Sequence, residues 1–431
     1  MHGFEGGKHL TSFKGLTKDK PITPLPVPKQ VVIPLSQHTG AICEVLVKEG
    51  DKVKTGTKIG QSPSFVSSCI HSSISGVVSE ISDYSHPVLG LCKSIIIDSD
   101  GNDEHIALLT KRAQAESLSR DELLGIIKES GIVGLGGAAF PAQVKLNPPK
   151  PVDTLIINGV ECEPYLTCDF RLMLEGTTGI LNGIRLIQKM AKARQVFIGI
   201  EDDKPEAIKA MRNKIAALSL DMEVVSLPAK YPQGAEKQLI KAIVNREVPP
   251  AGLPFDIGVV VSNVGTALAI YEAVYFKKPL YERIVTVTGP LLKNPANLKV
   301  RLGTRFHELI EFCQPRTEQV AKIIMGGPMM GLAQFSDDVP VIKGTSGILL
   351  LPQDKNDKEK EQPCIRCGRC VDVCPMRMLP YIFSLFGQSK RYESAAEYNP
   401  ADCMECGICT YVCPSKRRIL EYIRLIKVVL K

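Results

Sequence analysis

The sequence predicts a multidomain α/β protein, in which a mostly parallel sheet is accompanied by a small β domain and a cysteine-rich domain. A chain of 431 residues argues for about three domains. From residue 121 onward, strand-like and helix-like segments alternate, which is typical of α/β folds. Eight of the fourteen cysteines lie between Cys364 and Cys413, so this region is expected to form a unit of its own.

Composition and charge exclude several classes of protein. Hydrophobic residues make up 44% and charged residues 23%, as in ordinary globular chains. The longest apolar runs are far shorter than the ~20 residues of a membrane-spanning helix, and the first residues lack the pattern of a signal peptide. We therefore expect a cytoplasmic chain. The net charge of +7 is spread along the sequence, so nucleic acid is not an expected partner.

The N-terminal part is expected to contain an arm and a small β domain. Residues 1–30 include a proline-rich stretch that favours extended backbone. Residues 31–110 show short β-branched runs punctuated by glycine. Within them, "VLVKEGDKVKTGTKIG" (residues 45–60) and "HSSISGVVSEI" (71–81) resemble the barrel-sandwich fold of biotinyl and lipoyl carrier domains. The connecting residues 61–70 contain no lysine to modify, so we expect an unmodified docking domain.

The middle of the chain, residues 115–280, is predicted to be the α/β domain. Strands are expected at residues 154–158, 195–200, 223–227 and 258–262, and helices at 206–218 and 266–276. This order implies a mostly parallel sheet, with functional loops at the carboxyl ends of its strands.

The C-terminal third divides into four segments. Residues 282–352 give a strand, a Gly-Pro turn, a second strand and a helix, and resemble the β-grasp module called SLBB. The charged run 353–362 is expected to be a solvated linker before a cysteine domain at 363–415. The tail, 416–431, has apolar residues at helical spacing with basic residues between them. It could lie on a membrane surface, on a partner subunit or on its own cysteine domain.

The cysteine domain carries a specific signature. Two runs of C-x2-C-x2-C-x3-C-P are present, which predict two 4Fe-4S clusters whose fourth ligands are exchanged between the runs. Tetrahedral zinc would use close pairs of cysteines without a third at the same spacing. We assign one cluster to Cys364, Cys367, Cys370 and Cys413, and the other to Cys374, Cys403, Cys406 and Cys409.

Four loops of the α/β domain are expected to converge on one crevice. "GLGGAAFP" (residues 134–141) follows a probable helix rather than a strand, so it is not a Rossmann fingerprint. Its glycines still allow backbone amides to approach a phosphate or a flat ring. "NGVECEP" (158–164), "YPQGAEKQ" (231–238) and "SNVGT" (262–266) each come just after a predicted strand.

On these motifs, residues 121–280 resemble the flavin-carrying, NADH-oxidising subunit of respiratory complex I. The whole chain resembles the RnfC family of Rnf-complex proteins, including "FEGGKH" (residues 4–9) and "LPVPKQVVIPLSQHTGA" (25–41). This resemblance implies FMN, two 4Fe-4S clusters and NAD(H) as substrate. A flavin would then accept a two-electron hydride and pass single electrons to the clusters.

The resemblance also implies roles for particular residues. The flavin and its phosphate would be bound by Gly134, Gly136, Gly137, Lys145, Asn263 and Thr266. The flavin edge and the nicotinamide would be met by Asn158, Glu161, Tyr231 and Glu236, and the nucleotide by Phe140 and Glu163. Glu161 and Glu163 are the candidate catalytic carboxylates. Two positions depart from the complex I pattern, because Leu135 replaces an arginine and Gly265 a glutamate.

The leading functional hypothesis is a peripheral electron-transfer subunit on the cytoplasmic face of a membrane complex. It would work with integral membrane and ferredoxin-like subunits, and couple ferredoxin and NAD redox chemistry to Na⁺ or H⁺ transport. Two alternatives remain open at this point. One is a cobalamin reductase of bacterial microcompartments, which shares the flavin and double-cluster layout. The other is a non-catalytic iron-sulfur relay that has lost the flavin, for which Leu135 is the best argument.

Overall fold

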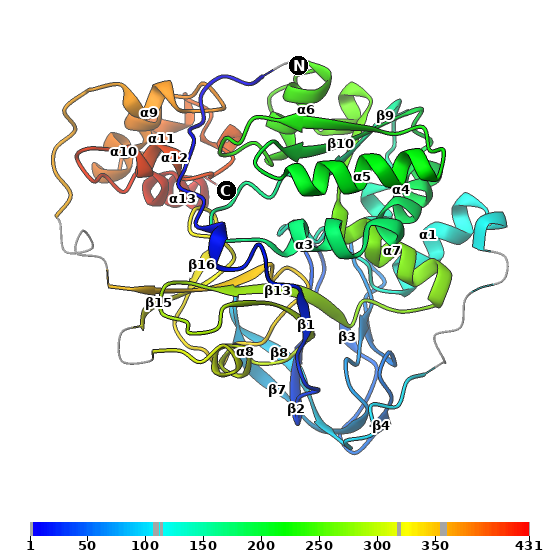
Figure 1. Cartoon of the computed structure of the whole chain (residues 1–431). Coiled ribbons are helices and arrows are strands. Elements are labelled where there is room, and N and C mark those ends of the chain that lie inside the picture. Colours follow the sequence, from blue (N-terminus) through cyan, green and yellow to red (C-terminus); the bar gives the residue numbers. More distant parts are fainter. Residues whose placement is uncertain (1–2, 107–111, 113–114, 317–319, 354–359, 431) are drawn as a thin grey trace.

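The fold combines an α/β domain, two β domains and a helical cysteine domain. The computed structural model describes residues 3–106, 112, 115–316, 320–353 and 360–430. The predicted linker, 353–362, falls mostly outside the described residues. The α/β domain and the cysteine domain lie side by side, and the two β domains lie on the opposite side of the molecule (Figure 1).

The first β domain has the two small sheets expected of a barrel sandwich. One sheet has the order β2 (Gln30–Pro34), β8 (Gly90–Ser99), β7 (Gly76–His86) and β4 (Lys52–Val53). The other has the order β3 (Glu44–Val45), β5 (Lys58–Gln61) and β6 (Ile70–His71). Because side chains alternate along a strand, Val31, Ile33, Ile95 and Ile97 enter one buried cluster, which residues of the second sheet complete.

The α/β domain is built on a four-stranded parallel sheet. Its order is β11 (Glu223–Leu227), β10 (Gln195–Glu201), β9 (Thr154–Asn158) and β12 (Val259–Asn263). The four predicted strands are therefore confirmed, with ends that differ by no more than one residue. Long runs of Val, Ile and Leu are typical of strands that are buried on both faces. Leu155 and Ile157 point into one core cluster, and Ile156 between them points into the other.

Helices cover both faces of this sheet. The larger core involves α1 (Arg120–Glu129), α3 (Cys168–Glu175), α4 (Thr177–Ala191), α5 (Pro205–Ala217) and α7 (Val264–Phe276). The other face is covered by α6 (Glu236–Val244) and the 3-10 helix η3 (Pro254–Ile257). Two short elements, η2 (Ala115–Ser117) and α2 (Ala142–Lys145), flank α1. The predicted helices at 206–218 and 266–276 correspond to α5 and α7.

The second β domain is a six-stranded sheet that contains a strand from the N-terminal arm. Its order is β1 (Ile22–Pro24), β14 (Ala296–Arg301), β13 (Glu282–Thr288), β17 (Gly347–Pro352), β15 (Val320–Met325) and β16 (Leu332–Gln334). Helix α8 (Phe306–Phe312) adds to its core. The sequence predicted an arm that only leads into the first domain. Instead β1 pairs in parallel with β14, after the short helix η1 (Lys14–Leu16).

The cysteine domain consists of short helices, among them α9 (Arg369–Asp372), α10 (Pro380–Gln388), α11 (Tyr392–Ala396), η6 (Pro400–Asp402) and α12 (Ile408–Tyr411). The tail forms α13 (Ile419–Val429), and its buried residues Ile419, Ile423 and Ile426 join the domain core. Of the three alternatives for the tail, packing on its own domain is therefore the one observed. Among the described residues, no helix is both long and apolar enough to cross a membrane.

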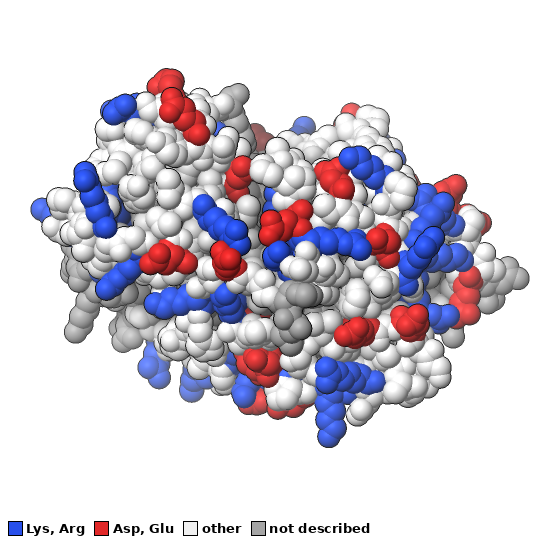
Figure 2. All heavy atoms as spheres, turned by 90° about the horizontal axis from the view of Figure 1, so that it is seen from above, with Lys and Arg blue, Asp and Glu red and all other residues white. Residues whose placement is uncertain are grey.

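The charges on the upper face are mixed. Figure 2 shows basic and acidic side chains interspersed over both halves of this face. The net charge of +7 does not gather there into a tract of one sign.

Candidate functional site

The carboxyl ends of the parallel strands bring the predicted loops together. Asn263 at the end of β12 is in register with Asn158 at the end of β9. On the other side of β9, strand β10 ends at Glu201, in register with Leu227 of β11. The loops after these strands are therefore neighbours at one edge of the sheet, as expected for a doubly wound fold.

The glycine loop, residues 134–140, lies against this edge. The amide of Leu135 donates to Thr266 Oγ1 at 2.9 Å, and a Cβ added at Gly136 would lie 3.6 Å from Asn263 Cβ. Gly137 has a φ of +111°, which other residues rarely adopt. Residues 136–138 are exposed, and within the described part of the chain their backbone amides donate to no protein acceptor. Free amides beside a helix N-terminus suit a phosphate, so the loop fits FMN.

Asn263 connects the glycine loop to the loop after β9. Its side-chain oxygen accepts from the amides of Gly265 at 2.8 Å and Thr266 at 3.3 Å, and so caps helix α7. Its Nδ2 donates to Asp169 Oδ2 at 2.7 Å. Burial and the neighbouring Glu161 raise the pKa of Asp169 to about 7. Asp169 was not among the predicted site residues, and no motif in the sequence marks it.

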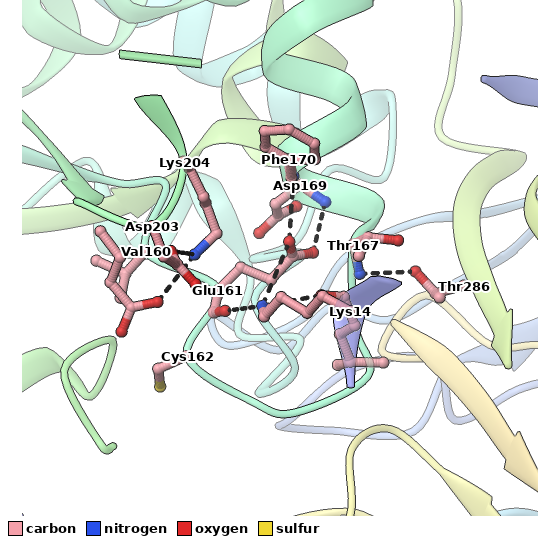
Figure 3. Close-up of polar contacts among 12 residues, drawn as sticks. Lys14, Val160, Glu161, Cys162, Thr167, Asp169, Phe170, Asp203, Lys204 and Thr286 are labelled. Carbon is pink, nitrogen blue, oxygen red and sulfur yellow. Dashed lines mark hydrogen bonds and ion pairs between the residues drawn. The ribbon is translucent and has the colours of Figure 1, made fainter. Parts of the chain in front are cut away.

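Glu161 is held in place by the start of helix α3 (Figure 3). Its two carboxylate oxygens accept from the amides of Asp169 at 2.8 Å and Phe170 at 3.3 Å. Its side chain is 4% exposed, and Lys14 Nζ lies 3.9 Å from its Oε2. Glu161 has a φ of +50°. The predicted carboxylate is therefore fixed in a buried turn close to Asn263 and Asp169.

Glu163 lies where the α/β domain meets the second β domain. Its carboxylate accepts from the amides of Met329 at 3.1 Å and Met330 at 2.7 Å, in the turn between β15 and β16. Burial raises the pKa of Glu163 to about 7. The structure thus separates the two candidate catalytic carboxylates, because Glu161 faces α3 while Glu163 supports a contact between domains.

The remaining predicted residues form contacts within and between the loops of the site. Asn158 Nδ2 donates to the carbonyl of Gly234 at 2.8 Å, which ties the loop after β9 to the loop after β11. Lys145 Nζ forms an ion pair with Glu236 Oε1 at 2.5 Å, so these two predicted residues meet. Gly134 donates to the carbonyl of the half-buried Phe140 at 2.8 Å and closes the glycine loop.

Tyr231 is directed toward the cysteine domain. Its side chain is 1% exposed, and its hydroxyl donates to the carbonyl of Cys406 at 2.7 Å. Burial raises the pKa of Tyr231 far above its ordinary value, so the hydroxyl stays protonated. We expected this residue at the flavin ring or the nicotinamide. The structure shows that its side chain contacts the cysteine domain.

Several site residues escaped the sequence analysis. Lys204 Nζ binds Glu201 Oε2 at 2.9 Å and Asp203 Oδ1 at 2.8 Å beside the turn of Glu161. In the sequence, the acidic run 201–203 after the predicted strand 195–200 could have indicated this cluster. Lys14 had no comparable signal, because it comes from the arm, 147 residues before Glu161.

The eight motif cysteines line two separate cavities. The cavity that we call inner is lined by Cys374, Cys403, Cys406 and Cys409. The cavity that we call outer is lined by Cys364, Cys367, Cys370 and Cys413. These are the two sets that the exchanged-ligand pattern predicts. Among the described residues, no three His, Cys, Asp or Glu side chains converge as ligands of one metal ion. Four cysteines line each cavity, which is the number and type of ligands that one 4Fe-4S cluster takes.

The two cavities differ in their surroundings. Next to the inner cavity, Gln238 of helix α6 donates to the carbonyl of Pro375 at 3.2 Å. The arm also reaches this point, where the amide of Gly7 donates to the carbonyl of Val373 at 2.8 Å. At the outer cavity, Cys367 is exposed and Ile365 is 67% exposed. The inner cavity therefore adjoins the α/β domain, and the outer cavity reaches the surface.

These sites define an electron-transfer protein that combines a flavin domain with a two-cluster iron-sulfur domain. Four family models match in the same order. Residues 2–102 match the RnfC barrel sandwich hybrid domain, and 127–272 the Nuo51 FMN-binding domain. Residues 284–333 match the SLBB domain, and 363–416 the 4Fe-4S dicluster domain.

Curated relatives extend this match to the full length. The chain is 49% identical over 430 residues to a subunit of the proton-translocating ferredoxin:NAD(+) oxidoreductase complex of Clostridium ljungdahlii, covering 99% of this chain and 94% of the relative. It is 43% identical over 429 residues to the corresponding subunit of the Na(+)-translocating complex of Acetobacterium woodii, covering 99% and 97%. The equivalent subunit of the ion-translocating oxidoreductase complex of Rhodobacter capsulatus is 42% identical over 380 residues, covering 87% and 73%. The chain belongs to this family, the RnfC subunits of the Rnf complex.

A solved structure supports the fold. The NAD+-reducing [NiFe]-hydrogenase in its air-oxidized state matches with a TM-score of 0.50 and 19% identity. The match covers 66% of this chain and 55% of that one.

Proposed function

We propose that this chain exchanges electrons between NAD(H) and the rest of its complex, with FMN at the glycine loop and clusters in the inner and outer cavities. The observation that carries the proposal is the order of the sites. The inner cavity adjoins the α/β domain through Tyr231 and Gln238, whereas the outer cavity reaches the surface at Cys367. FMN, when bound, supplies the change from a two-electron hydride to single electrons.

The residues of the chain provide binding and orientation. The free amides of Gly136 and Gly137, beside the capped end of helix α7, would hold the phosphate. Asn158 and Glu161 are fixed by hydrogen bonds and would meet the flavin edge. Glu163 supports the turn at Met329, so its contribution would be indirect. We place the chain peripherally on the cytoplasmic face of the membrane, where integral and ferredoxin-like subunits would contact it.

The test is anaerobic reduction by NADH of the full chain loaded with FMN and iron-sulfur clusters. Stopped-flow absorbance would follow the flavin, and freeze-quench electron paramagnetic resonance the clusters. Two matched variants, Cys406→Ser and Cys367→Ser, remove an inner and an outer ligand. With Cys367→Ser, NADH should still reduce the flavin and the inner cluster. With Cys406→Ser, rapid reduction of the outer cluster should be lost.

Two results would overturn the proposal. Equal rates of reduction of the outer cluster in wild type and Cys406→Ser would reject the order of the cavities. A chain that binds both clusters but neither binds FMN nor responds to NADH would be an iron-sulfur relay, the non-catalytic alternative.

A further inference from the structure

The N-terminal arm places a buried lysine in the candidate flavin site. The arm runs between the α/β domain and the cysteine domain (Figure 1). The carbonyl of Ser12 accepts from the amide of Tyr165 at 2.8 Å, and the ring of Phe13 stacks on that of Tyr165 at 4.7 Å. Beyond Lys14, the hydroxyls of Thr17 and Thr167 lie 2.7 Å apart. The arm is therefore anchored on both sides of Lys14.

The ammonium group of Lys14 closes the turn that carries Glu161. It donates to the carbonyl of Glu161 (Figure 3) and, at 2.9 Å, to the carbonyl of Leu166. Within this turn, Glu161 and Tyr165 have φ angles of +50° and +71°. Such backbone persists only where the surroundings hold it. Lys14 links the carbonyls at the two ends of the turn, and so supplies that restraint.

The ammonium of Lys14 also faces the carboxylate of Glu161, and burial lowers the pKa of this lysine. Lys204, another buried cation, is bound to Glu201 and Asp203 and also interacts electrostatically with Glu161. The side chain of Lys14 is 10% exposed, and its ammonium lies 3.9 Å from Glu161 Oε2. The neighbouring Asp169, whose pKa burial and Glu161 raise, interacts in addition with the buried Arg283.

We propose that Lys14 is a positioning residue for the flavin site, which fixes the turn of Glu161 from outside the α/β domain. The inference rests on the proposed function, because it concerns the FMN of that same site. A positive charge near the ring also tunes the electronics of a flavin. Loss of this charge should shift the flavin midpoint potential to more negative values, and a displaced Glu161 turn should slow reduction by NADH by roughly 10- to 100-fold.

The experiment compares Lys14→Gln, Lys14→Arg and the control Lys18→Gln in the full chain loaded with FMN and clusters. Gln keeps a hydrogen-bond donor but not the charge, and Lys18 is an exposed lysine of the same arm. Anaerobic potentiometry would give the flavin potential, and stopped-flow absorbance the rate of reduction. We expect a lower potential and a slower rate for Lys14→Gln, near-wild-type values for Lys14→Arg, and no change for Lys18→Gln. Equal values for Lys14→Gln and Lys18→Gln would overturn the inference.

A double-variant cycle with Glu161→Gln distinguishes positioning from general destabilisation. If Lys14 acts through Glu161, the effects of the two substitutions on the FMN dissociation constant should not be additive. Additive effects would overturn the inference. If Lys14→Gln loses clusters because the carboxylate of Glu161 no longer faces the ammonium, the double variant should retain its clusters. Loss of clusters in the double variant as well would overturn the inference. Failure of the proposed function is distinguished from failure of this inference by the wild-type chain, which would then lack FMN or a response to NADH.

Discussion

The contact between Tyr231 and Cys406 gives a sharp prediction about how the cysteine domain is held. Tyr231→Phe removes only the hydroxyl, which donates to the carbonyl of Cys406 at 2.7 Å. Among the described residues, that carbonyl has no other donor. The ring of Tyr231 is 1% exposed, so water cannot readily replace the lost bond.

The expected cost follows from this burial. A buried acceptor left without its donor costs about 1–3 kcal/mol. This cost applies to the docked state, because the carbonyl of Cys406 would be hydrated when the domains separate. A loss of about 2 kcal/mol changes the equilibrium between docked and separated domains by roughly 30-fold. Separation should become more frequent while each domain stays folded.

Hydrogen exchange measures this opening directly. The informative amide is that of Gly7, which donates to the carbonyl of Val373 at the same junction. In Tyr231→Phe it should exchange faster by roughly 30-fold, if its exchange requires separation of the domains. Tyr398→Phe is the matched control, because Tyr398 is 38% exposed. Equal exchange of Gly7 in both variants would refute the reasoning, as would faster exchange spread over the whole α/β domain.

Two further predictions concern the glycine loop and the buried carboxylate Glu163. Gly137→Val should lower the FMN content, because a residue with a side chain pays about 1–2 kcal/mol for a left-handed backbone. The control is Gly90→Val, which is also at positive φ with open space around it and should keep its FMN. Equal losses of FMN in the two variants would contradict the assignment of the glycine loop. The pKa of Glu163 is about 7 in the folded chain, against an ordinary value of 4.5. Between these pH values the native state therefore binds more protons than the unfolded state. The contribution of Glu163 to the free energy of unfolding falls as pH rises through that window. The loss is on the order of 3 kcal/mol. In Glu163→Gln the difference in unfolding free energy between pH 5 and pH 8 should shrink accordingly, and an unchanged difference would show that another group titrates.

Local sequence patterns predicted the elements and the cluster cysteines. The spacing of the two cysteine runs is a short-range constraint, because three ligands of one cluster must come from one tight loop. The buried parallel strands are continuous apolar runs, so β9 and β11 were predicted with the ends that the structure shows. The loops after these strands were expected to converge, and the structure adds that Asn158 and Asn263 end in register on neighbouring strands.

Contacts between domains could not be predicted in this way. Lys14 meets Glu161 across 147 residues, and Tyr231 meets Cys406 across 175. Neither contact has a periodicity or a motif, because each depends on how separately folded units pack together. The family resemblance gave Tyr231 and Glu163 roles at the flavin or the nucleotide. The structure shows that both side chains also bind neighbouring domains.

The sequence by itself determined which units the chain contains and which cysteines belong together, since these depend on spacing and on apolar runs within single segments. Only the tertiary structure decided that the arm enters the site, that Lys14 pairs with Glu161, and that the inner cavity adjoins the α/β domain. The physical reason is that these features arise from packing between segments far apart in the chain. Such packing is set by the shape and charge of complete surfaces.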